Sequence, residues 1–182
     1  MKLYFVRHGL TQWNIDGYMQ GQSDIPLCDK GREQARETAK LLSDKHIDIC
    51  ISSPLSRARE TAEIILQGRD VPIITDERII ERAFGSYEGS TAFYTGSEEY
   101  RKTMWNLDGD GKFDDMEPIA SVVKRVYAFL DDIKEKYKDK SVLITAHGGL
   151  SPAVKYYIAG QEISENYLFD IVKNCEIIEG EI

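Results

Sequence analysis

Two histidines of this sequence each follow a short apolar run and precede a glycine. His8 follows residues 2–6 and His147 follows residues 141–145, and both runs have the composition of β-strands. Ligands of open α/β sheets bind at the carboxyl ends of strands, so we expect the two histidines to share one site. A neutral imidazole can attack phosphorus when its attacking nitrogen carries no proton. We expect the other nitrogen of His8 to donate to a nearby carbonyl, for example that of Gly9, which would fix the tautomer.

Two arginines and an asparagine accompany these histidines. Arg7 adjoins His8, and Arg57 lies near the start of a helix that we expect after the sequence SSP at 52–54. A guanidinium binds phosphoryl oxygens through two parallel donors, and a helix N-terminus favours an anion. Asn14 is a further candidate for binding phosphate, although its side chain could instead only cap a turn.

A carboxylic acid near a bound phosphoryl group could protonate a leaving alkoxide and then activate water. The segment ERAFGSYEG at 81–89 offers Glu81 and Glu88 for this role. Either could instead be a surface group or a helix cap. Arg82 could add to a basic pocket or form a structural ion pair.

The elements that must position these side chains alternate along the chain. Apolar runs predict strands at residues 2–6, 47–51, 71–75, 141–145, 169–172 and 176–178. Helical spacing of apolar residues predicts helices at residues 31–43, 54–66, 121–137 and 151–158, with a short helix at 98–105. This alternation is typical of an α/β domain, and we expect a three-layer sandwich with a mainly parallel central sheet and helices on both faces.

Composition limits the domain count and the partners. The chain has 182 residues, of which 42% are hydrophobic, and no linker-like segment interrupts it, so we expect one domain over residues 1–182. A formal net charge of −8 argues against a nucleic-acid partner. No apolar stretch approaches the roughly 20 residues that span a bilayer, and three cysteines fit reduced thiols better than a disulfide framework. We therefore expect a cytoplasmic protein without a membrane partner, whose oligomeric state the sequence leaves open.

Four segments in this order resemble the histidine phosphatase superfamily, which has the phosphoglycerate mutase-like fold. They are RHGLTQWN at 7–14, SSPLSRARETA at 52–62, ERAFGSYEG at 81–89 and TAHGG at 145–149, and GQSDIPLCDKGREQA at 21–35 extends the likeness. The resemblance implies an enzyme with a phosphohistidine intermediate and no required cofactor. It implies His8 as the nucleophile and ranks Glu81 above Glu88 as the proton donor. The phosphate-binding residues that it implies, beside the catalytic His147, are Arg7, Asn14, Arg57 and Gly148.

One position departs from the family pattern. The family commonly has threonine where this chain has Cys28, at the expected N-cap of the helix that follows. A thiol caps less well than a hydroxyl, so we expect Asp29 to compensate. The departure concerns local stability rather than catalysis.

The segment NLDGDGKFDDME at 106–117 has the spacing of a calcium-binding EF-hand loop. Its candidate ligands are Asn106, Asp108, Asp110, Lys112, Asp114 and Glu117, the Lys112 position contributing its backbone carbonyl. Against calcium, the loop is unpaired, and its first ligand is not aspartate. The simpler interpretation is an acidic, solvated loop within a lid insertion at 90–119.

The motifs favour a phosphomonoester hydrolase that acts through phospho-His8 on a small phosphorylated metabolite. Two alternatives remain: a phosphoglycerate mutase, and a non-catalytic module that binds phosphorylated ligands. A mutase needs a water-excluding lid and contacts to a substrate carboxylate, and the acidic lid suits an anionic phosphoglycerate poorly. The substrate itself stays open, because the aromatic residues of the lid, Phe93, Tyr94, Tyr100 and Trp105, could stack on a base or sugar or simply pack the lid.

Overall fold

A mainly parallel five-stranded sheet lies at the centre of this computed structural model, which describes residues 1–105, 115–163 and 167–182. The strand order is β3-β2-β4-β1-β5, and β5 alone runs antiparallel to its neighbour β1. The strands are β1 (Lys2–Arg7), β2 (Ile49–Ser52), β3 (Ile73–Thr75), β4 (Ser141–Ala146) and β5 (Ile177–Glu181).

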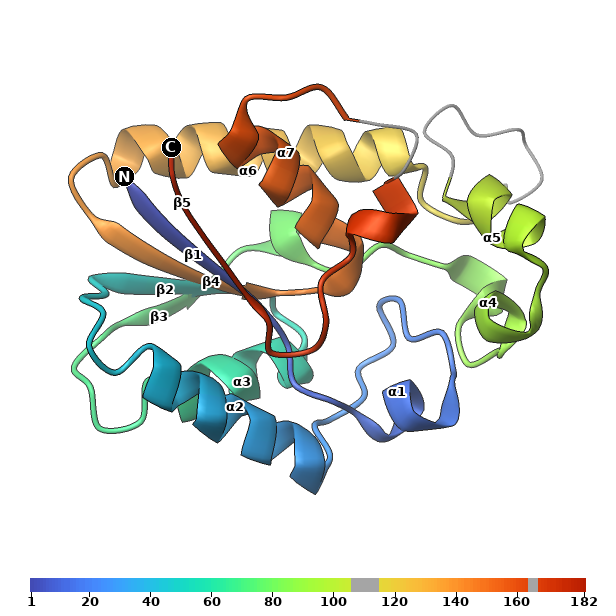
Figure 1. The fold of residues 1–182 in the computed structure, drawn as a ribbon, viewed down its shortest axis with the longest axis horizontal. Coiled ribbons are helices and arrows are strands. Elements are labelled where there is room, and N and C mark those ends of the chain that lie inside the picture. Colours follow the sequence, from blue (N-terminus) through green and yellow to red (C-terminus); the bar gives the residue numbers. More distant parts are fainter. Residues whose placement is uncertain (106–114, 164–166) are drawn as a thin grey trace.

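Helices cover both faces of the sheet and make three layers (Figure 1). One face carries α2 (Asp29–Leu41) and α3 (Ser56–Ile65), and the other carries α6 (Ile119–Lys136) and α7 (Ser151–Ala159). Alternate side chains of a strand point to opposite faces, so β1 contributes to two cores. Leu3 and Phe5 pack with α6 and α7, whereas Tyr4 and Val6 pack with α3. The predicted three-layer α/β architecture is confirmed.

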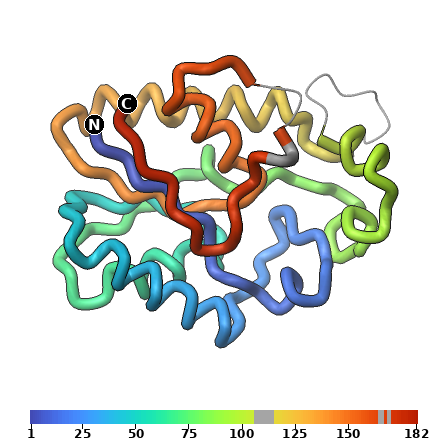
Figure 2. Tube along the Cα trace, viewed as in Figure 1, coloured from blue at the N-terminus to red at the C-terminus, as the bar shows by residue number. Residues whose placement is uncertain are grey.

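Short helices lie beyond the carboxyl ends of the parallel strands (Figures 1 and 2). The α-helices there are α1 (Gln12–Asp16), α4 (Ala92–Thr95) and α5 (Glu98–Met104). The 3₁₀ turns of the described chain are η1 (Glu77–Ile79), η2 (Gly85–Tyr87), η3 (Gly148–Leu150) and η4 (Tyr167–Asp170). Of these elements, α1 and α4 supply side chains to the site described below, and η3 supplies two glycines. Within the described ranges, no helix is both long and apolar enough to cross a membrane.

The prediction of a strand at residues 169–172 is wrong. This part of the chain contains η4 and then an irregular segment instead. The Val172 backbone bonds to side chains, because its N–H donates to the Ser151 hydroxyl and its carbonyl accepts from Arg7. Both edges of β1 are occupied, by β4 and β5, so this segment cannot pair with β1.

The N-terminus of α2 lacks a side-chain cap. Cys28 occupies the N-cap position, as the sequence predicts, and its thiol makes no capping hydrogen bond. Asp29 lies in the first turn, where a carboxylate complements the helix dipole, and it also pairs with Arg32 at 3.0 Å.

Candidate active site

The register of β1 and β4 brings the two strand-end histidines together. Arg7 lies opposite Ala146 in this parallel pair, so the residues that follow, His8 and His147, are neighbours. The His8 N–H donates to the Ala146 carbonyl at 2.9 Å, and the two imidazole centroids are 5.3 Å apart. Both side chains are buried. The expected pairing of the two histidines is therefore present.

One nitrogen of His8 is fixed by the backbone. Nδ1 lies 2.7 Å from the Gly9 carbonyl oxygen. A carbonyl only accepts hydrogen bonds, so Nδ1 carries the proton and Nε2 carries the lone pair. Burial, together with the charges of Arg57 and Arg7, holds the pKa of His8 well below its ordinary value. The imidazole is therefore neutral at neutral pH, with Nε2 free to act as a nucleophile.

Two arginines flank this imidazole, and Arg57 is buried whereas Arg7 is partly buried. Arg7 ends β1 and donates from Nη1 to the Val172 carbonyl at 2.7 Å. Arg57 lies in the first turn of α3 and donates to the carbonyls of Ser23 at 2.8 Å and Gly21 at 2.6 Å. Within the described residues, the buried Nε atoms of both arginines have no hydrogen-bond partner. Burial lowers the pKa of Arg57 to about 10, which still leaves it charged at neutral pH.

Gly148 allows the Arg7 guanidinium to lie close to the backbone. A Cβ atom at this position would lie 2.9 Å from Cζ of Arg7. Gly148 begins η3 directly after His147, so a larger residue here would displace the arginine from the pocket.

His147 is held from the opposite side by a serine. Its Nε2 lies 2.7 Å from Oγ of Ser53, a residue that follows β2. Its Nδ1 is buried and has no partner in the described part of the chain. Burial lowers the pKa of His147 well below its ordinary value, and the charge of Arg57 adds to this effect.

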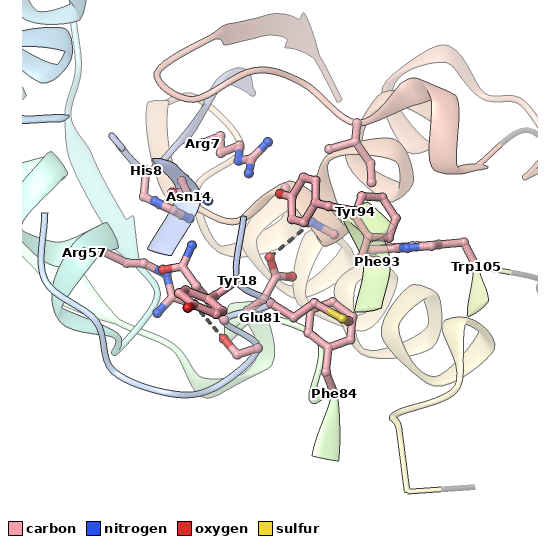
Figure 3. Close-up of a pocket in the computed structure, with 16 residues that line it drawn as sticks. Arg7, His8, Asn14, Tyr18, Arg57, Glu81, Phe84, Phe93, Tyr94 and Trp105 are labelled. Carbon is pink, nitrogen blue, oxygen red and sulfur yellow. Dashed lines mark hydrogen bonds between the residues drawn. The ribbon is translucent and has the colours of Figure 1, made fainter. Parts of the chain in front are cut away.

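Of these groups, Arg7, His8, Arg57 and Gly148 border a cavity of about 280 Å³ (Figure 3). Figure 3 shows His8, Asn14 and Arg57 on one side of the cavity and Phe93 and Trp105 on the other. The predicted site residues that line it are Arg7, His8, Asn14, Arg57, Glu81 and Gly148, and His147 lies directly beside His8.

The two glutamates of segment 81–89 have different surroundings. Glu81 lines the cavity, and its carboxylate accepts from the Arg82 N–H at 2.9 Å and the Gly149 N–H at 3.3 Å. Glu88 accepts from the backbone N–H groups of Gln22 and Ser23. It thereby holds the loop whose carbonyls bind Arg57. Glu81 is the carboxylate that can reach a ligand in the cavity.

Asn14 both caps a helix and lines the cavity. Its Oδ1 accepts from the Thr11 N–H at 3.1 Å, and the Thr11 hydroxyl accepts from the Asn14 N–H, which makes a capping box for α1. The same side chain lines the cavity. Because Oδ1 accepts in the cap, the amide nitrogen Nδ2 is the atom suited to donate to an anionic oxygen.

Arg82 is structural rather than part of the cavity. Its Nε donates to the Glu117 carbonyl at 2.6 Å and its Nη1 to the Met104 carbonyl at 2.8 Å. The carboxylate of Glu117 forms a bidentate ion pair with Arg125, at 2.7 and 2.9 Å.

The calcium hypothesis gains no support from the described chain. Its candidate ligands Asn106, Asp108, Asp110, Lys112 and Asp114 lie outside the described residues. Glu117, which would close the loop, is committed to its ion pair with Arg125. Where the chain is described, no group of three or more His, Cys, Asp or Glu residues could hold a metal ion.

The outer wall of the cavity contains residues to which the sequence assigned no role. They are Tyr18, Met19, Gln20, Gly21, Phe84, Gly149 and Ile171. Phe93, Tyr94 and Trp105, which the sequence left between stacking and packing, line the same wall. Aromatic residues occur in every core, so their types alone gave no signal. For Gly21 the signal was the motif at 21–35, which the sequence analysis noted without deriving a contact.

Comparison with known proteins identifies the family. A sequence model of the histidine phosphatase superfamily (branch 1) matches residues 3–182. The uncharacterized phosphatase PhoE of Bacillus subtilis (strain 168) is 37% identical over 155 residues, which are 85% of this chain and 76% of that protein. The probable phosphoglycerate mutase GpmB of Escherichia coli O1:K1 / APEC is 37% identical over 150 residues, 81% of this chain and 70% of that one. The crystal structure of the alpha-ribazole phosphatase from Shigella flexneri has a TM-score of 0.83 at 27% identity, and the match covers 98% of this chain and 89% of that one.

The chain belongs to the histidine phosphatase superfamily, as its motifs predicted. It is a phosphatase, a phosphoric monoester hydrolase that acts on small phosphorylated metabolites.

Proposed function

We propose that this phosphatase works through a covalent phosphohistidine on His8. The observation that carries the proposal is the neutral His8 imidazole, held by Gly9 with its Nε2 lone pair free, between the buried Arg57 and the partly buried Arg7. Buried donors without a protein partner are costly, and a bound phosphoryl group would supply the missing acceptors. Among the described residues, the Nε atoms of both arginines are such donors, and Nδ1 of His147 is likewise buried without a partner.

In the first step, Nε2 of His8 attacks phosphorus as the ester P–O bond breaks. Arg7 and Arg57 stabilise the charge on the phosphoryl oxygens, because their positions are fixed before the reaction. His147 and Asn14 add neutral donors to the same oxygens, and Gly148 leaves room for the Arg7 guanidinium.

Glu81 supplies the proton that the leaving oxygen requires. In the second step, its carboxylate accepts a proton from water as the water attacks the phosphohistidine and the N–P bond breaks. Inorganic phosphate leaves, and His8 and Glu81 return to their starting forms. Every step uses side chains of this chain, so we expect full activity in the presence of EDTA.

The substrate proposal follows from the outer wall of the cavity. Beyond the phosphoryl end, the wall is mainly aromatic and apolar, with Phe84, Phe93 and Trp105 among its members. Among the described lining residues, the cationic ones are Arg7 and Arg57, and both belong to the phosphoryl end. The cavity therefore suits a phosphomonoester whose leaving group is apolar or aromatic and has no second anionic group. Residues 90–119 would form the lid, and their described part supplies Phe93, Tyr94 and Trp105.

This wall favours hydrolysis over a phosphoglycerate mutase reaction, which requires contacts to the substrate carboxylate. We expect kcat/KM for an aryl phosphate to exceed that for 3-phosphoglycerate at least about tenfold, since a buried carboxylate without a partner costs well over 1 kcal/mol. Equal values would contradict the substrate proposal. Mutase activity without phosphate release would contradict hydrolysis.

The nucleophile is tested by substituting His8→Ala and measuring phosphate release together with acid-quenched labelling. We expect both activity and the acid-labile phosphoprotein to disappear. His46→Ala is the matched control, because His46 is an exposed histidine outside the cavity. Full activity in His8→Ala would contradict the proposal. Phosphate binding without turnover by the unaltered protein would instead indicate a non-catalytic module.

A further inference from the structure

Ser53 has a place in the sheet that brings it against the second histidine. The strands β2, β4 and β1 lie side by side in that order, so the residues after their carboxyl ends form a row. In this row, the Ser53 N–H donates to the Thr145 carbonyl at 2.9 Å, and the His8 N–H donates to the Ala146 carbonyl. Ser53 and His8 therefore lie on opposite sides of His147.

The single proton of the Ser53 hydroxyl can be placed by its partners. Oγ is fully buried, and in the described part of the chain its neighbours are the Leu55 N–H at 3.3 Å and His147 Nε2 at 2.7 Å. An amide N–H only donates. The acceptor for the hydroxyl proton is therefore Nε2 of His147, which must then carry a lone pair.

The opposite arrangement leaves more groups unsatisfied. If Nε2–H donated to Oγ, the buried hydroxyl proton would have no acceptor and Nδ1 of His147 would be a buried lone pair. With the hydroxyl as donor, the Nδ1–H is the one group of the pair that lacks a partner among the described residues. Buried polar groups are rarely left unpaired, so the second arrangement is favoured.

We propose that Ser53 is a positioning residue that holds His147 in the Nδ1–H tautomer, so that His147 donates to a phosphoryl oxygen. The two histidines then have complementary roles. Gly9 fixes the proton of His8 on Nδ1 and leaves Nε2 as a nucleophile, whereas Ser53 fixes Nε2 of His147 as an acceptor and leaves Nδ1–H as a donor. The part played by the phosphate rests on the proposed function, but the tautomer is a property of the free protein.

Burial matters to this assignment because it keeps His147 neutral. Removal from water lowers the pKa of His147, and the charges of Arg57 and Arg7 lower it further. An imidazolium would have protons on both nitrogens and no need of a serine to select between them.

The tautomer is tested by ¹⁵N NMR of the ring nitrogens in the free, full-length protein. The chain has three histidines, so His46→Ala and His8→Asn spectra assign the signals of His147. We expect Nδ1 of His147 to be protonated and Nε2 to be unprotonated. In Ser53→Ala, we expect the signals to move to the Nε2–H form or to an average of the two forms.

Ser52→Ala is the matched control. Ser52 is also fully buried at the end of β2, but its hydroxyl donates to the Ser53 carbonyl at 2.9 Å rather than to a histidine. We expect its His147 spectrum to match that of the unaltered protein. A wild-type His147 protonated on Nε2 would overturn the proposal, and so would a Ser53→Ala spectrum identical to the wild type.

Inhibition by inorganic phosphate gives the functional readout. In Ser53→Ala, loss of the Nδ1–H donor of His147 should raise the inhibition constant for phosphate about tenfold or more. Ser53→Thr retains the hydroxyl and should restore the wild-type inhibition constant. Thermal melts show whether each variant is folded. If the added methyl group prevents folding of Ser53→Thr, the NMR comparison of Ser53→Ala with Ser52→Ala decides whether Ser53 holds the tautomer of His147. Unchanged inhibition in folded Ser53→Ala would overturn the role in phosphate binding. If the tautomers are as expected but His8 is not labelled, the proposed function is contradicted and the assignment of His147 is not.

Discussion

Burial lowers the pKa of both His8 and Arg57 at this cavity, but it leaves the two side chains in different charge states. It lowers the pKa of His8 far enough to keep the imidazole neutral, which a nucleophile requires. It also lowers the pKa of Arg57, but only to about 10, so the guanidinium remains charged and can bind an anion. The same desolvation therefore leaves one residue neutral and the other cationic, because their ordinary pKa values differ by about 6 units.

At the residue scale, Glu81→Gln tests the proton donor. A glutamine keeps the shape and still accepts from the Gly149 N–H, but it cannot give a proton to the leaving oxygen. We expect kcat for an alkyl phosphate to fall by about 10²–10⁴-fold, with a smaller loss for 4-nitrophenyl phosphate, whose leaving group needs little protonation. Steady-state kinetics with both substrates provide the measurement.

Glu63→Gln is the control for that substitution, because Glu63 forms an exposed ion pair with Arg59 on α3. It should leave both rates unchanged. An equal loss for the two substrates in Glu81→Gln would argue that Glu81 acts in binding rather than in proton transfer.

At the element scale, the loop at 20–23 connects the carboxylate of Glu88 to the guanidinium of Arg57. Glu88 accepts from its backbone N–H groups, and its carbonyls in turn accept from Arg57. Helix α3 fixes the other end of the Arg57 side chain. The position of this guanidinium thus depends on a helix and on a loop held by a carboxylate more than 60 residues away.

The uncapped N-terminus of α2 gives a prediction about stability. Cys28→Thr supplies a hydroxyl at the N-cap, where the Cys28 side chain makes no capping hydrogen bond. We expect the free energy of unfolding to rise by about 0.5–2 kcal/mol, with unchanged kcat, since an N-cap bond satisfies a free backbone donor. Urea unfolding measures the difference. Cys28→Ala, which cannot cap, should show no gain, and a similar gain in both variants would show that removal of the thiol was responsible.

At the scale of the whole molecule, the two buried histidines link stability to pH. Their pKa values are lowered in the folded protein, so below about pH 6.5 the unfolded chain binds protons that the folded chain does not. The free energy of unfolding should therefore fall as pH drops below that value, by up to about 1.4 kcal/mol per pH unit for each histidine. Urea unfolding at pH 6.5 and 5.5, above most carboxylate titration, measures this slope.

Substituting both histidines identifies the source of that slope. We expect His8→Asn combined with His147→Asn to flatten it, and we expect the exposed His46→Ala to retain it. If the double variant kept the full slope, other groups would be responsible for the pH dependence.

Much of this protein was predictable from its sequence because the relevant signals are local. Apolar runs and helical spacing predicted the strands β1, β2 and β4 and the helices around them, and the motifs at 7–14 and 145–149 predicted that His8 and His147 would share a site. The Gly9 contact of His8 was also predictable, because it joins adjacent residues.

The tertiary structure alone placed Glu81 at the cavity and Glu88 at the loop at 20–23, paired Ser53 with His147, and showed η4 and an irregular segment in place of the strand expected at 169–172. Each of these outcomes depends on a partner that is distant in the chain, such as the hydroxyl of Ser53, 94 residues from His147. Local sequence determines which secondary structure a segment prefers and which groups it offers. The order of the strands in the sheet determines which groups meet, and that order follows from packing the whole chain rather than from any one segment.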